Sequence, residues 1–338
     1  MVELSTLFDL EERRVRDEIV KRGVSRVLIQ LPEGLRSEAV RISSIVEEAG
    51  ALAIVSADPC YGACDLALNE ALILSADLII HYGHSELERL KWRVNVPVIY
   101  IEAKANIDIK SLVEEAIRQL SPWEKIGLAT VVQHTHILSD VEETLKRAGK
   151  KVYVGSEAGL KYPGQVLGCD YRNAKAISKH VEAFLFIGGG LFHATGLYLA
   201  TMKPVIAVDP FERKVYRVDD EAKRIINRRW MSISEASDAR TWGVIIGLKI
   251  GQMDFETSLK VKRDIEGAGR RAVLLAMREV TPEILMNFPT IEAYVNTACP
   301  RISLYEAQKF HRPVLTPKEL YVAIGRVSWE EYLQSGLL

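Results

Sequence analysis

The stretch ALAIVSADPCYGACD, residues 51–65, joins a strand to a loop that carries two thiols. Its apolar part, Ala51–Val55, has the length and composition of a buried strand in a parallel sheet. Pro59 and Gly62 then turn the chain, so that Cys64 lies beyond the carboxyl end of this strand. Because ligands of open α/β sheets bind at that end, the stretch predicts an α/β fold with a thiol in its ligand site.

Size and composition are those of a globular protein with more than one domain. The chain has 338 residues, of which 48% are hydrophobic and 26% are charged, and its formal net charge is −1. No apolar run approaches the about 20 residues of a membrane helix, and Met1–Ser5 lacks the basic patch and apolar run of a secretion signal. We therefore expect a cytoplasmic protein without membrane contact. The lack of a basic surplus disfavours direct nucleic-acid binding.

A pattern of strands and turns occurs three times along the chain. The predicted strands are residues 27–31, 52–56, 78–80 and 97–101, then 126–132, 152–154, 184–187 and 204–208, then 244–248, 272–276, 293–296 and 313–315. Helices that end at Ala-Gly pairs, at residues 49–50, 148–149 and 268–269, follow the first strand of each repeat. We predict three similar α/β modules with parallel sheets, residues 1–105, 106–215 and 216–338, packed about a pseudo-threefold axis.

Two helical segments lie outside this repeat pattern. Residues 4–21 have the spacing of an amphipathic helix that covers a sheet edge. Residues 219–238 form a basic helical connector, which we expect to be a solvated helix face with one anchor. The alternative is a docking patch for an acidic or RNA-bound partner. Its cationic and aromatic residues are Lys223, Arg224, Arg228, Arg229 and Trp230.

Three of the four cysteines follow strands of different modules. Cys64 and Cys169 follow the second strands of modules one and two, and Cys299 follows the third strand of module three. If the strand ends face one cavity, each module contributes one thiolate. Zinc fingers take their ligands from closely spaced pairs, whereas iron–sulfur clusters prefer thiolates. The pattern therefore predicts a [4Fe–4S] cluster whose fourth iron is open to an amino-carboxylate substrate.

The remaining candidates are weaker. Cys60 forms a C-x-x-x-C pair with Cys64, but Ala67 stands where the usual radical S-adenosylmethionine motif has a third cysteine, so we interpret Cys60 as a packing thiol. Six residues at predicted strand ends could contact a cofactor or substrate. Each also has a structural interpretation, as a solvated acid, a local cap, a buried histidine or a tight turn. They are Glu33, Gln133, His134, Gly188, Gly189 and Asp209.

Three cysteine motifs carry a resemblance to a known family. Tyr61–Asp65, Pro163–Cys169 and Ala298–Arg301 resemble the archaeal 2-(3-amino-3-carboxypropyl)histidine synthase family, which starts diphthamide biosynthesis. The resemblance spans nearly the whole chain. It extends to Leu31–Leu35, Gly83–Ser85, Gln133–His134, Phe192–His193, Asp209–Pro210 and Pro313–Pro317.

This resemblance implies a homodimer of three-domain subunits with a [4Fe–4S] cluster on Cys64, Cys169 and Cys299. It also implies an atypical radical use of S-adenosylmethionine, driven by an external electron donor. The sulfur–γ-carbon bond would break, and the 3-amino-3-carboxypropyl group would be transferred to C2 of a histidine on translation elongation factor 2. The sequence identifies no general base for this reaction.

Two other interpretations stay open at this point. A quinolinate-synthase-like dehydratase would also use three modules and one three-cysteine cluster, with the open iron as a Lewis acid. A non-catalytic scaffold stabilised by zinc would need no cluster at all. The first would ignore S-adenosylmethionine, and the second would contain zinc without sulfide.

Overall fold

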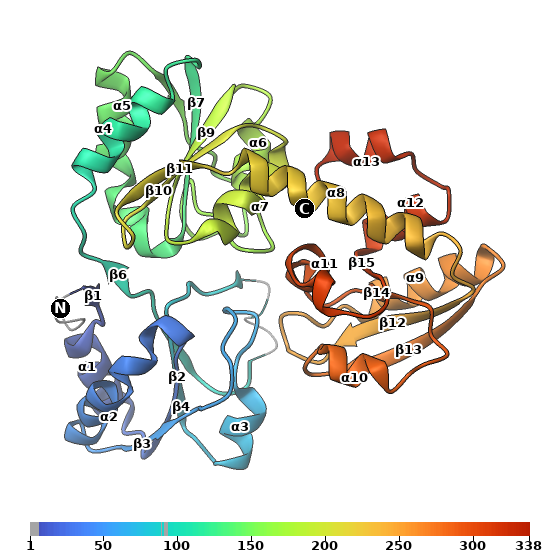
Figure 1. Cartoon of the computed structure of the whole chain (residues 1–338). Coiled ribbons are helices and arrows are strands. Elements are labelled where there is room, and N and C mark those ends of the chain that lie inside the picture. Colours follow the sequence, from blue (N-terminus) through green and yellow to red (C-terminus); the bar gives the residue numbers. More distant parts are fainter. Residues whose placement is uncertain (1–6, 89, 91–93) are drawn as a thin grey trace.

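The computed structural model describes residues 7–88, 90 and 94–338. It contains three separate sheets built mainly of parallel strands, each accompanied by helices, as Figure 1 shows. The predicted α/β fold with several parallel sheets is therefore confirmed. Among the described residues, no helix combines the length and the apolar character needed to cross a membrane.

The first sheet has the strand order β3-β2-β4-β5 and is parallel throughout. Its strands are β2 (Arg26–Gln30), β3 (Leu52–Val55), β4 (Leu78–Tyr82) and β5 (Val98–Ile101). Its helical elements are α1 (Glu12–Arg22), η2 (Glu33–Glu38), α2 (Ala39–Glu48) and α3 (Leu68–Ile73). The expectation of a buried strand at residues 51–55 is wrong, because β3 is an edge strand whose Leu52 and Val55 side chains are exposed.

The second sheet has the order β11-β10-β9-β7-β8, with β11 antiparallel at one edge. Its strands are β7 (Lys125–Thr130), β8 (Lys151–Tyr153), β9 (Ala183–Ile187), β10 (Val205–Asp209) and β11 (Lys214–Arg217). The helical elements are α4 (Lys110–Gln119), η4 (Val132–Ile137), α5 (Leu138–Arg147), α6 (Arg172–Ile177) and α7 (Leu191–Thr201). Alternate side chains of β9 pack into two different clusters, Phe184 and Phe186 in one and Leu185 and Ile187 in the other. Both faces of this sheet are therefore covered.

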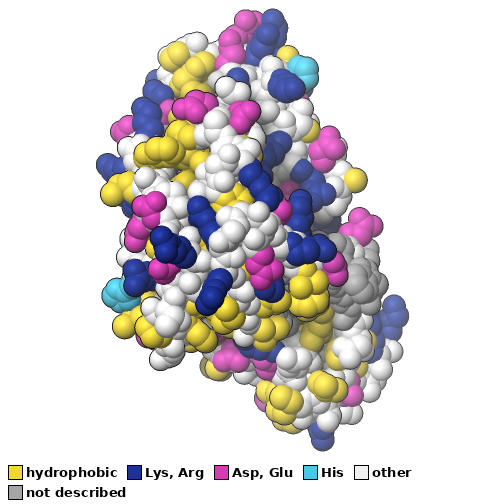
Figure 2. Space-filling model, turned by 90° about the vertical axis from the view of Figure 1, so that its right-hand side faces the viewer, with side chains coloured by type: hydrophobic (Ala, Val, Ile, Leu, Met, Phe, Trp, Pro, Cys, Tyr) yellow, Lys and Arg dark blue, Asp and Glu magenta, His cyan; other side chains and the backbone are white. Residues whose placement is uncertain are grey.

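The third sheet has the order β13-β12-β14-β15 and is parallel. Its strands are β12 (Thr241–Gly247), β13 (Arg271–Met277), β14 (Ala293–Asn296) and β15 (Val314–Leu315). Its helical elements are α8 (Asp219–Ala236), α9 (Phe255–Gly267), α10 (Pro282–Met286), α11 (Pro300–Tyr305), η5 (Ala307–Lys309), α12 (Pro317–Ala323) and α13 (Trp329–Ser335). Figure 2 shows lysine and arginine interspersed with aspartate and glutamate on the face that carries this sheet.

The three sheets share one strand order. In each, the second strand in the chain lies beside the first, followed by the third and the fourth. All twelve predicted strands are present, with ends that differ from the prediction by a few residues. The module boundaries at residues 105/106 and 215/216 and the pseudo-threefold axis stay predictions.

The amino-terminal helix is shorter than predicted. Phe8–Asp9 forms β1, which pairs antiparallel with β6 (Lys104–Ala105), and α1 begins only at Glu12. The Asp9 carboxylate accepts a hydrogen bond from the Glu11 backbone N–H at 2.9 Å, and Glu11 has a φ of 50°. This local turn ends the strand and separates it from the helix. Residues 4–6 of the prediction lie outside the described residues.

The basic connector is a helix, as predicted. It forms α8, which contacts α7 of the second module and α11 and α12 of the third. Of its cationic and aromatic residues, Arg229 is 0% exposed and is buried along with Ala222, Ile225, Ile233 and Ala236, whereas Trp230 is 46% exposed. The Arg229 guanidinium is paired with the Glu319 carboxylate at 2.8 Å. A cation is therefore among the buried residues that anchor this helix, because a matching anion from α12 compensates its burial.

Candidate functional site

A cavity of about 440 Å³ is lined by residues of all three modules. Cys64, Cys169 and Cys299 all lie on its wall, so the structure brings the three predicted thiols to one space. They come from the loop after β3, the loop after β8 and the residue before α11. Another hollow, of about 770 Å³, lies beside α1, and no cysteine lines it.

The third module holds the loop that carries Cys64. The backbone N–H of Gly251 donates to the Cys64 carbonyl at 2.9 Å, and Gln252 Nε2 lies 3.6 Å from the Cys64 sulfur. The two backbones are so close that a Cβ at residue 251 would lie 2.4 Å from the Cys64 Cα. Glycine at this position is what permits the contact.

Cys169 lies in a tight turn. The backbone N–H of Leu167 donates to the Asp170 carbonyl at 2.9 Å, and the Asp170 N–H donates to the Leu167 carbonyl at 3.3 Å. Within this turn, Gly168 packs against the Phe192 ring, where a Cβ would lie 2.4 Å from a ring carbon. The turn presents the Cys169 side chain, which is exposed, to the cavity.

Cys299 is the N-cap residue of α11, and Pro300 is the first residue of that helix. Asn296, at the end of β14, accepts the Cys299 N–H at 3.4 Å and donates from Nδ2 to the Cys299 carbonyl at 2.6 Å. Burial raises the pKa of the Cys299 thiol to about 11, and the nearby Cys64 adds to this rise. Cys299 and Cys64 line the same cavity.

Charged side chains line the same cavity as the thiols, among them Lys249, Glu279 and Arg301. Lys249 Nζ lies 3.2 Å from the Asp65 carboxylate and 2.7 Å from that of Glu279. The Arg301 guanidinium lies over the Phe192 ring, 4.8 Å from its centroid. The cavity wall thus offers three thiols together with paired charges. This donor set fits a thiolate-ligated iron–sulfur cluster.

Cys60 is in a different environment from the three thiols. It is 6% exposed, does not line the cavity, and burial raises its pKa to about 12. Its sulfur and one nitrogen each of His81 and His84 lie within 4.8 Å of one another. Of these three residues, His84 also lines the cavity of the three cysteines, whereas Cys60 and His81 do not.

The six weaker candidates separate into two groups. Gln133, His134 and Gly189 line the cavity. Gln133 Nε2 donates to the Gly83 carbonyl at 2.7 Å and so links the first two modules. His134 is 1% exposed, burial lowers its pKa to about 4, and neither of its ring nitrogens has a hydrogen-bond partner within the described residues.

Glu33, Gly188 and Asp209 do not line this cavity. Glu33 is exposed on the first turn of η2. The Asp209 carboxylate accepts backbone N–H bonds from Gly190, Phe211 and Glu212 at 2.8, 2.9 and 3.0 Å. This arrangement favours the structural interpretation of Asp209 as a cap of the β10 end.

Sequence reasoning missed several residues of the wall, among them His84, His193, Lys249, Gln252 and Arg301. The rule that places ligands at strand ends could have found His84, which follows β4 directly. Lys249 and Gln252 follow β12 in the same way. His193 lies inside α7, and its only sequence signal was the Phe192–His193 motif of the family resemblance.

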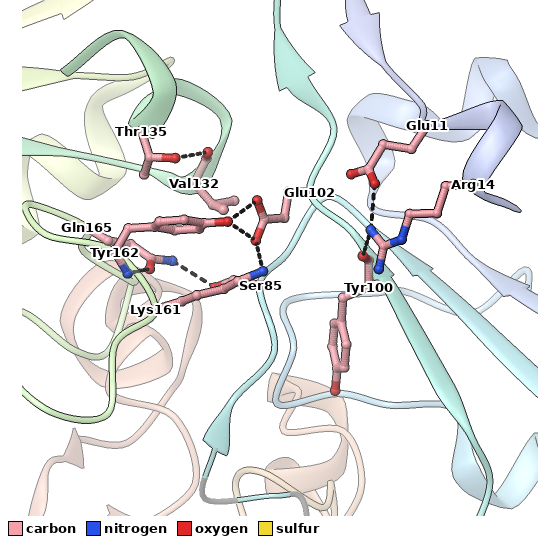
Figure 3. Close-up of polar contacts among 10 residues, drawn as sticks. All are labelled: Glu11, Arg14, Ser85, Tyr100, Glu102, Val132, Thr135, Lys161, Tyr162 and Gln165. Carbon is pink, nitrogen blue, oxygen red and sulfur yellow. Dashed lines mark hydrogen bonds and ion pairs between the residues drawn. The ribbon is translucent and has the colours of Figure 1, made fainter. Parts of the chain in front are cut away.

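Polar contacts lock the first two modules together beside the cavity (Figure 3). Glu102, which is 4% exposed, accepts hydrogen bonds from Lys161 Nζ at 2.6 Å and from the Tyr162 hydroxyl at 2.8 Å. Gln165 Nε2 donates to the Ser85 hydroxyl at 2.8 Å. The Cys169 loop therefore has a defined position relative to the first sheet.

Fold and cavity together define a class: an α/β protein in which three sheets share one three-thiol site. Comparison with known proteins identifies the family. The model of the diphthamide synthesis protein family matches residues 31–334, and the chain belongs to this family. The resemblance seen in the cysteine motifs is thereby confirmed.

Individual relatives agree with this assignment. The 2-(3-amino-3-carboxypropyl)histidine synthase of Pyrococcus horikoshii is 37% identical over 321 residues, which cover 94% of this chain and 91% of the relative. Subunit 1 of the Homo sapiens enzyme is 30% identical over 93% of this chain and 71% of its own. The crystal structure of Dph2 from Pyrococcus horikoshii with a 4Fe-4S cluster matches with a TM-score of 0.87 and 36% identity, over 98% and 95% of the two chains.

Proposed function

We propose that this chain is a 2-(3-amino-3-carboxypropyl)histidine synthase. It transfers the 3-amino-3-carboxypropyl group of S-adenosylmethionine to a histidine of translation elongation factor 2, the first step of diphthamide biosynthesis. The observation that carries this proposal is the meeting of Cys64, Cys169 and Cys299 on one cavity wall, in a chain that is 37% identical to a named synthase.

Cys64, Cys169 and Cys299 would hold a [4Fe–4S] cluster. When bound, the cluster supplies one electron for breaking the sulfonium–carbon bond and an open iron for the methionine part. The cavity volume of about 440 Å³ lies within the range of small-molecule sites. Arg301 offers a cation to the carboxylate of this substrate, and Glu279 offers an anion to its ammonium group.

The proposal includes a homodimer, an external electron donor and a cytoplasmic location, where the elongation factor works. Gln133, His134 and Gly189 line the part of the wall available to the rest of S-adenosylmethionine or to the target histidine. The dehydratase and zinc-scaffold alternatives are disfavoured by the named relatives, all of which span most of this chain.

The central experiment follows the transferred group. The chain is reconstituted anaerobically with iron and sulfide, then incubated with dithionite, S-adenosylmethionine and elongation factor 2. We expect methylthioadenosine, and a mass increase of the factor by one 3-amino-3-carboxypropyl group. A cluster that ignores S-adenosylmethionine would favour the dehydratase, and zinc without sulfide would favour the scaffold.

Substitution tests the ligand assignment directly. Cys64→Ala, Cys169→Ala and Cys299→Ala should each lower the iron and sulfide content and abolish the transfer, because each removes one of three ligands. Cys60→Ala is the matched control and should retain both the iron–sulfur content and the transfer activity, since Cys60 does not line the cavity. A full cluster in any of the first three variants would contradict the assignment.

A further inference from the structure

A chain of hydrogen bonds runs from the first sheet to the cavity wall. His81 Nδ1 lies 2.9 Å from Gln30 Oε1, and His81 Nε2 lies 2.9 Å from His84 Nδ1. Gln30 ends β2 and His81 belongs to β4; they are 3% and 0% exposed. His84 follows β4 and lines the same cavity as the three cysteines.

Two backbone groups fix the orientation of the Gln30 amide. Its Nε2 donates to the Asp65 carbonyl at 2.6 Å, and its Oε1 accepts from the Ala67 N–H at 3.2 Å. A carbonyl can only accept and an N–H can only donate, so the amide oxygen is the atom that faces His81. His81 Nδ1 must therefore carry a hydrogen.

The hydrogen on His81 Nδ1 determines the direction of the remaining hydrogen bond, between His81 and His84. Burial lowers the pKa of His81 well below its usual value and that of His84 to about 4, so both rings are neutral at pH 7. A neutral imidazole has one N–H and one lone pair. His81 therefore accepts at Nε2, His84 donates from Nδ1, and His84 Nε2, on the ring edge away from His81, is left with the lone pair.

The proposed reaction needs such an acceptor. Over the whole transfer, the sulfonium–carbon bond of S-adenosylmethionine breaks, a carbon–carbon bond forms to C2 of the target imidazole, and the C2 hydrogen leaves as a proton. The electron that starts the bond breaking is recovered when the imidazole becomes aromatic again, so no net oxidation occurs. Loss of the proton restores aromaticity, and a weak neutral base is therefore sufficient.

Resting on this proposed function, we propose that His84 Nε2 accepts the proton that leaves C2 of the target histidine. His81 and Gln30 are positioning residues, because they act by holding His84 in the required tautomer. His134, another histidine of the cavity wall, has no hydrogen-bond partner for either ring nitrogen within the described residues. At His84, by contrast, the surroundings determine which ring nitrogen is the acceptor.

The first test separates bond breaking from transfer. His84→Gln should still form methylthioadenosine, whereas the ratio of modified elongation factor to methylthioadenosine should fall by about 100-fold, the usual contribution of an acid–base group. Deuterium at C2 of the target histidine should slow transfer further in this variant. His311→Gln, at an exposed position, is the control and should match the unsubstituted chain.

The outcomes are distinguishable. A wild-type ratio in His84→Gln would overturn the proposal, and so would a parallel loss of both products, which would place His84 in substrate binding instead. If the unsubstituted chain forms no methylthioadenosine, the proposed function itself fails.

A second test needs no cluster and no substrate. In ¹⁵N spectra of the cluster-free chain, His81 and His84 should both show the Nδ1–H tautomer, and Gln30→Met should weaken this preference at His81. An Nε2–H form of His84 in the unsubstituted chain would overturn the proposal. So would zinc bound at one ion per chain in the Cys64/Cys169/Cys299→Ala variant and lost on Cys60→Ser, because the metal would then occupy the histidine nitrogens.

Discussion

Arg229 in the third module and His134 in the cavity wall are both buried polar side chains, 0% and 1% exposed, with opposite surroundings. The Arg229 guanidinium donates to both Glu319 oxygens at 2.8 Å and to the carbonyls of Ser303 and Val314 at 2.6 and 2.9 Å. His134 has no partner for either ring nitrogen in the described part of the chain. A buried polar group without a partner costs free energy. The difference therefore separates a polar group that stabilises the fold from one that is available to a ligand.

The largest effect should come from breaking the satisfied group. Arg229→Met leaves Glu319 buried without its cation, and we expect a loss of about 3–5 kcal/mol in the free energy of unfolding. Urea unfolding followed by circular dichroism measures this change. The double variant Arg229→Met/Glu319→Gln should recover part of the loss, because no charge is left unpaired. If Arg229→Met is as stable as the wild type, the Arg229–Glu319 pair does not stabilise the fold, and the contrast with His134 is contradicted.

The effect of His134 should instead appear in the pH dependence of the free energy of unfolding. Burial lowers its pKa to about 4 from the ordinary 6.5, so between these values the unfolded chain binds a proton that the folded chain does not. The stability should therefore fall as the pH drops through this window, by up to about 3 kcal/mol from this residue. Unfolding experiments at pH 7.5 and 4.5 on the wild type and on His134→Leu test this.

In His134→Leu, the loss of stability between the two pH values should be smaller, although His81, His84 and His193 still contribute, since burial lowers their pKa values too. At pH 7.5 the variant should be no less stable than the wild type, because no hydrogen bond is lost. An unchanged pH dependence would contradict the account of His134.

The contact between the first two modules is a buried polar contact with two hydrogen-bond donors. Removing one of these donors should have the smallest effect on the free energy of unfolding. Tyr162→Phe removes the hydroxyl that donates to the buried Glu102 carboxylate, while Lys161 continues to pair with it (Figure 3). We expect a loss of about 1.5 kcal/mol, the lower value for a hydrogen bond to a charged group. Tyr153→Phe is the matched control, and equal unfolding free energies for both variants would show that this contact contributes nothing.

The strands were predictable from the sequence because short apolar runs bounded by turns are a local signal. The three cysteines were predictable as a group, since each follows a strand of a different sheet and ligands bind at the carboxyl ends of such strands. The burial of Arg229 was not predictable. Its partner Glu319 lies 90 residues further along the chain, and a basic helix without that partner resembles a solvated face.

The predictions that failed in the first module also depended on contacts with residues distant in the sequence. The apolar composition of β3 indicates a strand but carries no information on whether a neighbour covers it, and the edge position leaves Leu52 exposed. Phe8–Asp9 is too short for a strand signal and depends on its partner Lys104–Ala105. The His81–His84 chain was equally invisible, because it depends on the orientation of one amide by two backbone groups.

The contact between Gly251 and Cys64 has a consequence for the order of events during synthesis. Cys64 leaves the ribosome long before residue 251 can hold its loop, and Cys299 lies 235 positions further along the chain. At about 5–20 residues per second, this interval lasts about 12–47 s. If these three cysteines hold the proposed cluster, the complete ligand set becomes available only late in translation.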